Sequence, residues 1–319
     1  MENQPGFSKV TLGFLLAFIS AVCYGSMGTF MGLLGGYGLD QISIATLSPT
    51  FVAVYLAVKM AITNRQGFVV DWKGLLMMLI MGVVILNLTN IGMANAVMTV
   101  PVAIVSIMMF CNVFIVMVLS RILFKYKITA VKIITAVCAI FGLTFVLDVY
   151  HAGVSTIGAT GLMWTVLVMI VTALAYTGNK YILEKGYHWE ANLFYQNLFA
   201  AIFMYFTLSP WNLAGNVGAA TNAGGTAVLF AVLGFGLIPN IISFVFYMKG
   251  MELIEPTFVG LMYTLDPVTA AILGFAIFGQ VLSGLQIMGI LIVLAAIVYI
   301  QLKERQEEKK QDQAAALTN

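Results

Sequence analysis

An aspartate stands beside a proline inside a long apolar stretch, as Asp266 and Pro267 within residues 256–278. A helix rises about 1.5 Å per residue, so a helix over this stretch places the acid near the middle of a membrane. A charge at that depth costs about 3 kcal/mol or more, and such groups usually carry protons or orient ligands. The alternative is structural, because Pro267 cannot donate to the carbonyl of Tyr263 and a polar neighbour can satisfy the loosened backbone.

Polar residues spaced three apart recur in the apolar stretches, which puts the members of each pair on one helical face. The pairs are Tyr263 with Asp266, Asn87 with Asn90, and Asn240 with Ser243. Such a face either lines a cavity or forms hydrogen bonds between neighbouring membrane helices. The sequence leaves both interpretations open.

The composition identifies the environment of these residues. Hydrophobic residues make up 61% of the 319 residues and charged residues only 9%, too little polar surface for a soluble domain of this size. The apolar stretches are about 20 residues long, as transmembrane helices require, rather than the roughly 10 of barrel strands. We therefore expect an all-α integral membrane protein.

Ten transmembrane helices are predicted, with bounds uncertain by several residues. They cover residues 10–34, 42–62, 74–94, 99–122, 130–148, 160–182, 192–209, 226–248, 256–278 and 284–302. The Gly- and Asn-rich segment 210–225 is interpreted as a break between helices, and the tail from Lys303 as a short solvated helix or disorder. With this topology all fifteen Lys and Arg residues fall on the side of the termini, which the positive-inside rule assigns to the cytoplasm.

The chain also contains an internal repeat. Residues 20–25 are similar to residues 172–177, Pro101 and Pro256 open the fourth and ninth helices, and the polar pair at 87 and 90 corresponds to that at 240 and 243. The matches keep their order and divide the chain into two halves of five helices. Because five is odd, the halves have opposite orientations in the membrane, an arrangement common in secondary transporters that bind substrate where the repeats meet.

The residues of both halves resemble those of a known family. The run from Met251 to Gly260, continued through 265–273 and 278–280, is similar to the second repeat of EamA-type transporters in the drug/metabolite transporter superfamily. Residues 24–26 and 111–114 resemble the first repeat, and the likeness extends over about 11–301. It implies a carrier with ten membrane helices and a central cavity lined mainly by helices 1, 3, 4, 6, 8 and 9, but names no substrate.

The repeat supplies further candidate residues. Asn112 lies in the fourth helix at nearly the position that Asp266 and Pro267 hold in the ninth. Tyr24 and Tyr176 are related in the same way, and either pack against neighbouring helices or offer hydroxyls and ring faces to a ligand. Lys180 lies near the cytoplasmic end of the sixth helix, where it either reaches the lipid headgroups or pairs with an anionic substrate or Asp266.

Other chemistry lacks a basis in the sequence. Two isolated histidines and three scattered cysteines form no metal site or catalytic arrangement, and no phosphate-binding loop or nucleic-acid module occurs. We therefore expect no catalytic residues, metal, cofactor or nucleic-acid partner. An enzyme acting on lipid-linked substrates, or a channel or sensor, remains the alternative class.

The sequence as a whole predicts a secondary transporter of small organic solutes in the cytoplasmic membrane, with export favoured and Asp266 as the candidate proton-coupling acid. We expect a cytoplasmic segment at 1–9, repeats at 10–148 and 158–302, and a charged cytoplasmic tail at 303–319. The partners are the lipid bilayer and a small-molecule substrate. The sequence leaves open whether the protein is a monomer or a homodimer.

Overall fold

The computed structural model describes residues 8–151 and 158–318, and in this part of the chain all regular structure is helical. Eight helical segments are long and apolar enough to cross a membrane. They are Lys9–Gly36, Gln41–Thr63, Trp72–Met93, Val102–Phe124, Ala159–Glu184, Thr226–Leu253, Pro256–Phe278 and Gly284–Glu308. The predicted helical membrane architecture is confirmed.

Two of the ten predicted helices, at 130–148 and 192–209, are not by themselves long and apolar enough to cross a membrane. Helix α10 (Trp189–Thr207) passes only together with α11 (Pro210–Gly224), which is bent from it by 82°, and α8 (Ala130–Val146) is a shorter apolar helix. The structure therefore supports eight crossings, or nine with the bent pair, and the count of ten stays a prediction.

The segment 210–225 was expected to be a break and is instead mostly helix α11. Ser209 caps it by accepting a hydrogen bond from the backbone nitrogen of Asn212 at 3.2 Å, and Pro210 occupies the first turn, where its missing N–H costs nothing. The helix stops at Gly225, whose φ of 66° suits glycine. Local capping thus outweighed the Gly-rich composition.

Several crossings are interrupted rather than straight. With the crossings numbered as the ten predicted helices were, the first consists of α1 (Lys9–Gly25) and α2 (Met27–Gly36), the fourth of α6 (Val102–Phe110) and α7 (Asn112–Phe124), and the ninth of α14 (Pro256–Met262) and α15 (Leu265–Phe278). The third and eighth contain π-helical turns: Ile80–Leu86 lies between α4 (Trp72–Leu79) and α5 (Asn87–Ala96), and Gly236–Ile242 between α12 (Thr226–Phe235) and α13 (Ser243–Leu253). Breaks and π turns often mark functional positions in membrane helices.

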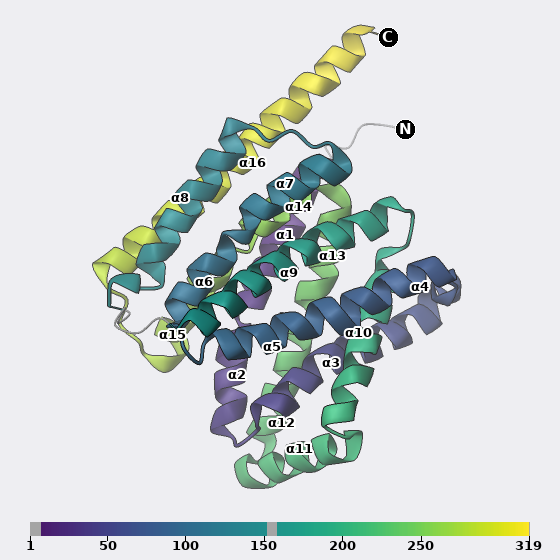
Figure 1. The fold of residues 1–319 in the computed structure, drawn as a ribbon, viewed down its shortest axis with the longest axis vertical. Coiled ribbons are helices and arrows are strands. Elements are labelled where there is room, and N and C mark those ends of the chain that lie inside the picture. The colour runs from purple at the N-terminus through teal and green to yellow at the C-terminus, as the bar shows by residue number, and fades with distance from the viewer. Residues whose placement is uncertain (1–7, 152–157, 319) are drawn as a thin grey trace.

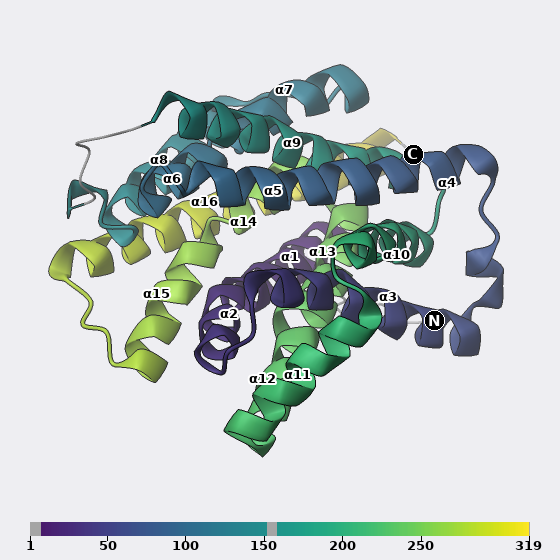
Figure 2. The ribbon, with the colours of Figure 1, turned by 60° about the horizontal axis from the view of Figure 1, so that its bottom comes forward.

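The two halves of the chain are packed into one another. Helix α1 packs along α13, α3 (Gln41–Thr63) along α10, and α8 along α16 (Gly284–Thr318), while α5 and α7 lie against α9 (Ala159–Glu184). Figure 2 shows α5, α7 and α9 in a layer over α1, α10 and α13. Each pairing joins a helix before residue 150 to one after it, so the centre of the bundle is shared by both halves.

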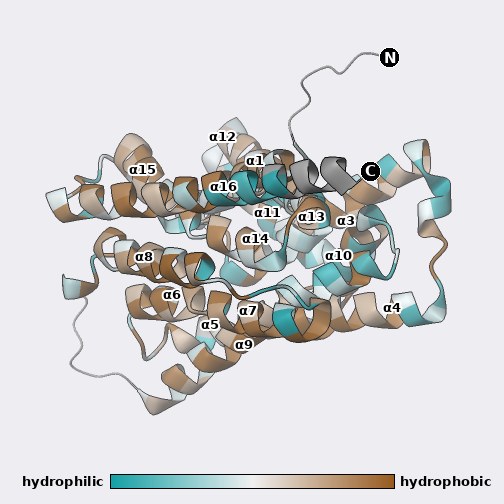
Figure 3. Cartoon of the chain, turned by 90° about the horizontal axis from the view of Figure 1, so that it is seen from above, coloured by the Kyte–Doolittle hydropathy of each residue, from teal (hydrophilic) through white to brown (hydrophobic). Residues whose placement is uncertain are grey.

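The surface and the ends of the bundle differ in polarity. Large hydrophobic side chains such as Ile134, Phe141 and Leu291 are exposed on the outer helices, and Figure 3 shows hydrophobic residues along most of α7 and α9. We call the end where α3, α7, α9 and α13 finish the charged end, because Lys59, Lys132 and Lys249 make their contacts there. Helix α16 continues past the bundle at this end (Figure 1), so the tail after Lys303 is helical.

Candidate functional site

Asp266 lies directly after the break in the ninth crossing. It is the second residue of α15, in the first turn, where the positive end of the helix dipole favours a carboxylate. Its backbone nitrogen donates to the carbonyl oxygen of Tyr263 at 3.0 Å, which occupies the carbonyl that Pro267 leaves unbonded. The side chain is partly accessible, and within residues 8–151 and 158–318 it makes no hydrogen bond or ion pair.

The break in the first crossing is pressed against this position. A Cβ atom added to Gly25 would lie 2.7 Å from the carbonyl oxygen of Asp266 and 2.6 Å from the Cβ of Thr269. Only glycine permits so close an approach between the two chains. The end of α1, from the first half, therefore meets the start of α15, from the second half, at the acid.

Four tyrosine rings gather beside the acid, and three of them were candidates from the sequence. The centroid of Tyr263 lies 5.4 Å from that of Tyr24, 5.9 Å from Tyr176 and 5.8 Å from Tyr247. Tyr176 and Tyr247 are also in contact, at 5.8 Å. We call these four residues the tyrosine cluster. Tyr24, Tyr176 and Tyr263 all lie close enough to Asp266 to interact with it electrostatically.

A serine pair fixes Tyr263 between α1 and α13. Ser20 donates its only hydroxyl proton to the carbonyl of Ser243 at 2.8 Å, so Tyr263 must be the donor in its 2.8 Å contact with the Ser20 hydroxyl. Ser243 in turn donates to the carbonyl of Ser20 at 3.0 Å. For Ser243 the structure thus shows hydrogen bonding between helices.

Three buried amide side chains extend the polar cluster towards α10. The Asn179 oxygen accepts hydrogen bonds from Asn192 at 2.9 Å and from Gln196 at 3.3 Å, and its nitrogen donates to the Tyr247 hydroxyl at 3.4 Å. The side-chain oxygen of Asn192 is buried without a partner among the described residues. These bonds tie α9, α10 and α13 together behind the tyrosine cluster.

Asn87 directly follows the first π turn, and Asn240 lies within the second. Asn240 donates to the carbonyl of Phe235 at 2.7 Å, and Asn87 to that of Gly82 at 3.1 Å, each five residues back along its helix. Both side chains are buried, and Asn240 also accepts a hydrogen bond from Ser48 of α3. Each amide therefore satisfies backbone that the π turn exposes. The side chain of Asn90 lies outside the described residues.

Two other candidates, Lys180 and Asn112, form no hydrogen bond with the tyrosine cluster in the described structure. The ammonium group of Lys180 is buried and donates to the carbonyl oxygens of Met251 at 2.8 Å, Ile254 at 3.3 Å and Glu252 at 3.4 Å. The ammonium group thus caps the carboxyl-terminal end of α13. It neither reaches the lipid headgroups nor pairs with Asp266. Asn112 is buried at the start of α7 and has no hydrogen bond to Asp266 in the described structure.

Ion pairs join the two halves at the charged end. Lys59 of α3 pairs with Glu190 of α10, and Lys132 of α8 donates to the Glu255 carboxylate at 2.6 Å. The ring of Trp189 lies under the Lys59 ammonium, 4.5 Å from its centroid.

A hydrogen bond outside the membrane helices adds to these contacts. The Tyr187 hydroxyl donates to Asp71 and holds the pKa of that exposed carboxyl below its ordinary range. Asp71 precedes α4 and Tyr187 precedes α10, so this bond also joins the two halves at the charged end.

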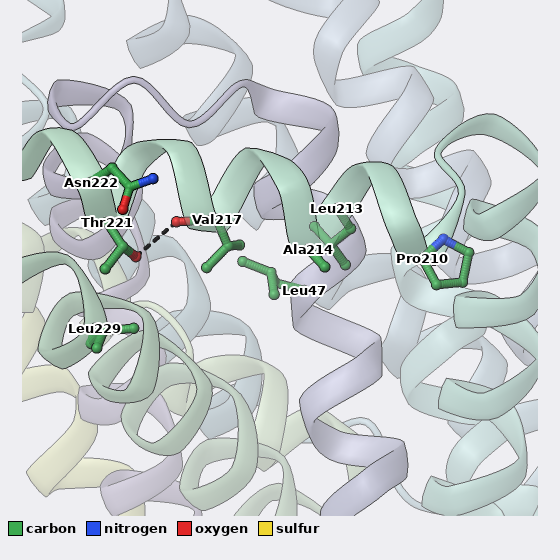
Figure 4. Close-up of a pocket in the computed structure, with 9 residues that line it drawn as sticks. Leu47, Pro210, Leu213, Ala214, Val217, Thr221, Asn222 and Leu229 are labelled. Atoms are coloured by element: carbon green, nitrogen blue, oxygen red, sulfur yellow. Dashed lines mark hydrogen bonds between the residues drawn. The ribbon is translucent and has the colours of Figure 1, made fainter.

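A separate pocket of about 530 Å³ lies at the opposite end of the bundle. Figure 4 shows it along α11, with Leu47 of α3 and Leu229 of α12 on its other sides. Its only polar side chains are Thr221 and Asn222, and Thr221 already donates to the carbonyl of Val217 at 2.7 Å. None of the candidate residues from the sequence lines this pocket.

Sequence reasoning missed Ser20, Tyr247 and the amide residues. Helical spacing was a signal for three of them. Ser20 lies four residues from Tyr24, Asn179 three residues from Tyr176, and Tyr247 four residues from Ser243, each on the same helix. Extending each candidate by one helical turn would have found them. Asn192 and Gln196 are four residues apart on α10, so the same spacing places them on one face.

The interlocked halves and the polar centre define a multi-pass helical membrane protein built from two repeats. A family model for the EamA-like transporter family matches residues 11–148 and again residues 159–302. The chain belongs to this family, and the predicted resemblance to drug/metabolite transporters is confirmed. It is a membrane transporter of this type.

Comparison with solved structures agrees on the fold. One crystal structure of a protein superposes with a TM-score of 0.73, covering 93% of this chain and 98% of the other at 14% sequence identity. A likeness at this identity shows the fold alone. No curated protein matches the chain at a significant level.

Proposed function

We propose that the protein is a secondary active transporter that moves small organic solutes across the cytoplasmic membrane, with export favoured and both termini in the cytoplasm. The observation that carries the proposal is the unpaired, partly accessible Asp266 at the point where helices of both repeats meet. Secondary transporters of inverted-repeat architecture bind their substrates at such a point.

Alternating access fits the distribution of contacts around this centre. At the charged end the repeats are joined by the pairs Lys59–Glu190 and Lys132–Glu255. At the opposite end α2 and α3 pack against α11 and α12 through apolar residues such as Leu34, Leu213 and Phe235. Rocking of one repeat against the other would open one set of contacts while the other stays closed, and expose the tyrosine cluster to one side at a time.

Asp266 is the proposed coupling acid. A carboxylate without a hydrogen-bond or ion-pair partner can release a proton when its surroundings are open to water and rebind one when they close. Tyr263 is held by Ser20 and lies at the break in the ninth crossing, so movement of α1 against α13 would change the surroundings of the acid.

Counterflow in proteoliposomes tests the transport function. Purified protein is reconstituted with a panel of metabolites, amino acids and drug-like solutes inside the vesicles, and uptake of the labelled solute is measured. We expect exchange of at least one class of solute. If the whole panel neither exchanges nor raises the thermal stability of the protein, the transport proposal fails.

The role of Asp266 has its own test with the solute found in this way. Asp266→Asn removes the titratable charge at nearly constant volume, and we expect it to abolish the pH dependence of transport while the fold is kept. Asp40→Asn is the matched control, because Asp40 caps α3 at the other end and asparagine caps a helix equally well. Unchanged rate and pH dependence in Asp266→Asn would exclude the coupling role.

A further inference from the structure

We propose that the central site accepts organic monocations, with the cationic group seated between the Asp266 carboxylate and the ring of Tyr24. The inference rests on the proposed transport function and assigns its class of substrate. It follows from the charge, the accessibility and the ring arrangement of the site.

Accessibility separates the residues that can receive a ligand from those that support them. Tyr176, Tyr247 and Tyr263 are only 7–8% exposed, whereas Tyr24 and Asp266 are both partly accessible. The buried rings contact one another and leave Tyr24 at the edge of the cluster, packed on Tyr263 at 5.4 Å and on Phe244 at 6.2 Å. A ligand that reaches the cluster therefore meets the Tyr24 ring and the carboxylate first.

Charge decides which ligand this pair favours. Asp266 has no cationic partner in the described structure, and Lys180, a buried ammonium group nearby on α9, is already bound by three carbonyl oxygens. An anion or a zwitterion would bring a second carboxylate to a site that already holds one, and like charges repel strongly where water is scarce. A cation supplies the missing counter-charge.

The rings favour the same class of ligand. The face of a tyrosine ring attracts cations, including alkylated ammonium groups, and Tyr24 is the ring of the cluster that is partly accessible. The Tyr24 hydroxyl makes no hydrogen bond among the described residues, so its ring is not held by a polar partner and can adjust to a bound cation. Ring faces and an acid together discriminate against neutral molecules of the same shape.

Binding to detergent-purified protein tests the assignment with three probes of similar size. Choline carries a trimethylammonium group, 3,3-dimethylbutan-1-ol is its neutral counterpart, and trimethylammonioacetate adds a carboxylate. Isothermal titration gives the Kd of each. We expect choline to bind at least about tenfold more tightly than either of the others.

Variants at the two ligand contacts complete the test. We expect Asp266→Asn and Tyr24→Leu each to weaken choline binding by about tenfold or more, and Tyr24→Phe to retain it because the ring face is kept. Asp40→Asn is the control and should bind as the parent does. If Asp266→Asn fails to fold, the comparison of Tyr24→Leu with Tyr24→Phe still decides whether the ring of Tyr24 binds the cation.

The proposal is overturned if choline does not bind, if the neutral or zwitterionic probe binds as tightly, or if Tyr24→Leu binds as Tyr24→Phe does. The transport proposal is judged separately by counterflow with the wider panel. Exchange of neutral or anionic solutes without choline binding would keep the transport function and remove the cation assignment. Choline binding without any exchange would keep the cation assignment and remove the transport function.

Discussion

Lys180 is a buried cation whose hydrogen bonds are all with backbone at the end of α13. The last carbonyl groups of a helix lack partners within it, and a positive charge beside them is favoured by the helix dipole. The three carbonyl oxygens of Met251, Glu252 and Ile254 surround the ammonium group. A buried charge in a membrane protein is often a ligand site, but here the partners are internal and the role is structural.

Replacing this lysine tests that role. Lys180→Met keeps the length of the side chain and removes the donors, so we expect a loss of about 1–3 kcal/mol of stability, seen as a lower melting temperature in detergent. Lys185→Met, at an exposed lysine near the same end of α9, should melt as the parent does. Equal melting of all three proteins, together with weaker substrate binding by Lys180→Met, would instead favour contact with an anionic ligand.

At the scale of elements, the crossing of α1 and α15 depends on one glycine. Gly25→Ala places a methyl group 2.6 Å from the Thr269 Cβ and 2.7 Å from a backbone oxygen, so the helices must separate. Overpacking of this kind costs about 1–3 kcal/mol, and we expect a lower melting temperature and slower transport. Gly28→Ala is the matched control, because nothing lies within 4 Å of its added Cβ. A melting temperature in Gly25→Ala no lower than in Gly28→Ala would contradict the close crossing.

The elements themselves were largely predictable from the sequence. Apolar stretches of membrane length have few alternatives, so the helices expected at 256–278 and 42–62 are found as Pro256–Phe278 and Gln41–Thr63. The breaks at Ser26 and Cys111, and the π turn over Ile80–Leu86, contain no proline, whereas Pro239 lies within the π turn over Gly236–Ile242. Those without a proline depend on contacts between helices, such as the approach of Gly25 to Asp266, which a linear pattern does not contain.

The site was predictable in its residue types but not in its arrangement. The repeat and the cost of burying polar groups indicated Tyr24, Tyr176, Tyr263 and Asp266, and the structure brings the three rings beside the acid. Asn87 and Asn240 were selected by the same reasoning and bind backbone at the π turns instead. Helical spacing shows that a residue shares a face with another, but not which helix that face meets.

At the scale of the whole molecule, the two repeats are similar in topology and unequal at their centre. Asn112 begins α7 after the break in the fourth crossing, and Asp266 nearly begins α15 after the break in the ninth. The first crossing is interrupted at Ser26, whereas α9 is continuous over Ala159–Glu184. The proposed exchange of conformations between the repeats would therefore move a single acid, as the proposed coupling through Asp266 requires.

The ion pairs at the charged end join the two repeats in this structure. Glu190 of the Lys59–Glu190 pair is largely buried, and loss of Lys59 leaves it, among the described residues, only the contact with His188 at 3.5 Å, so we expect the contact between α3 and α10 to weaken. Because the pair joins α3 to α10, its loss should favour the conformation in which the charged end is open.

Charge reversal provides the measurement. In a background with Cys111→Ala and Cys138→Ala, the remaining Cys23 lies on α1 directly before Tyr24 and reports access to the centre. We expect Lys59→Glu to raise the rate of Cys23 labelling by an impermeant maleimide added at the charged end by about fivefold or more. In the double variant Lys59→Glu with Glu190→Lys, the labelling rate should return most of the way to that of the parent. It should not return fully, because the cation over Trp189 is lost. Lys73→Glu, an exposed reversal at the same end, is the control. If labelling in Lys59→Glu does not exceed labelling in that control, the pair does not hold the charged end closed.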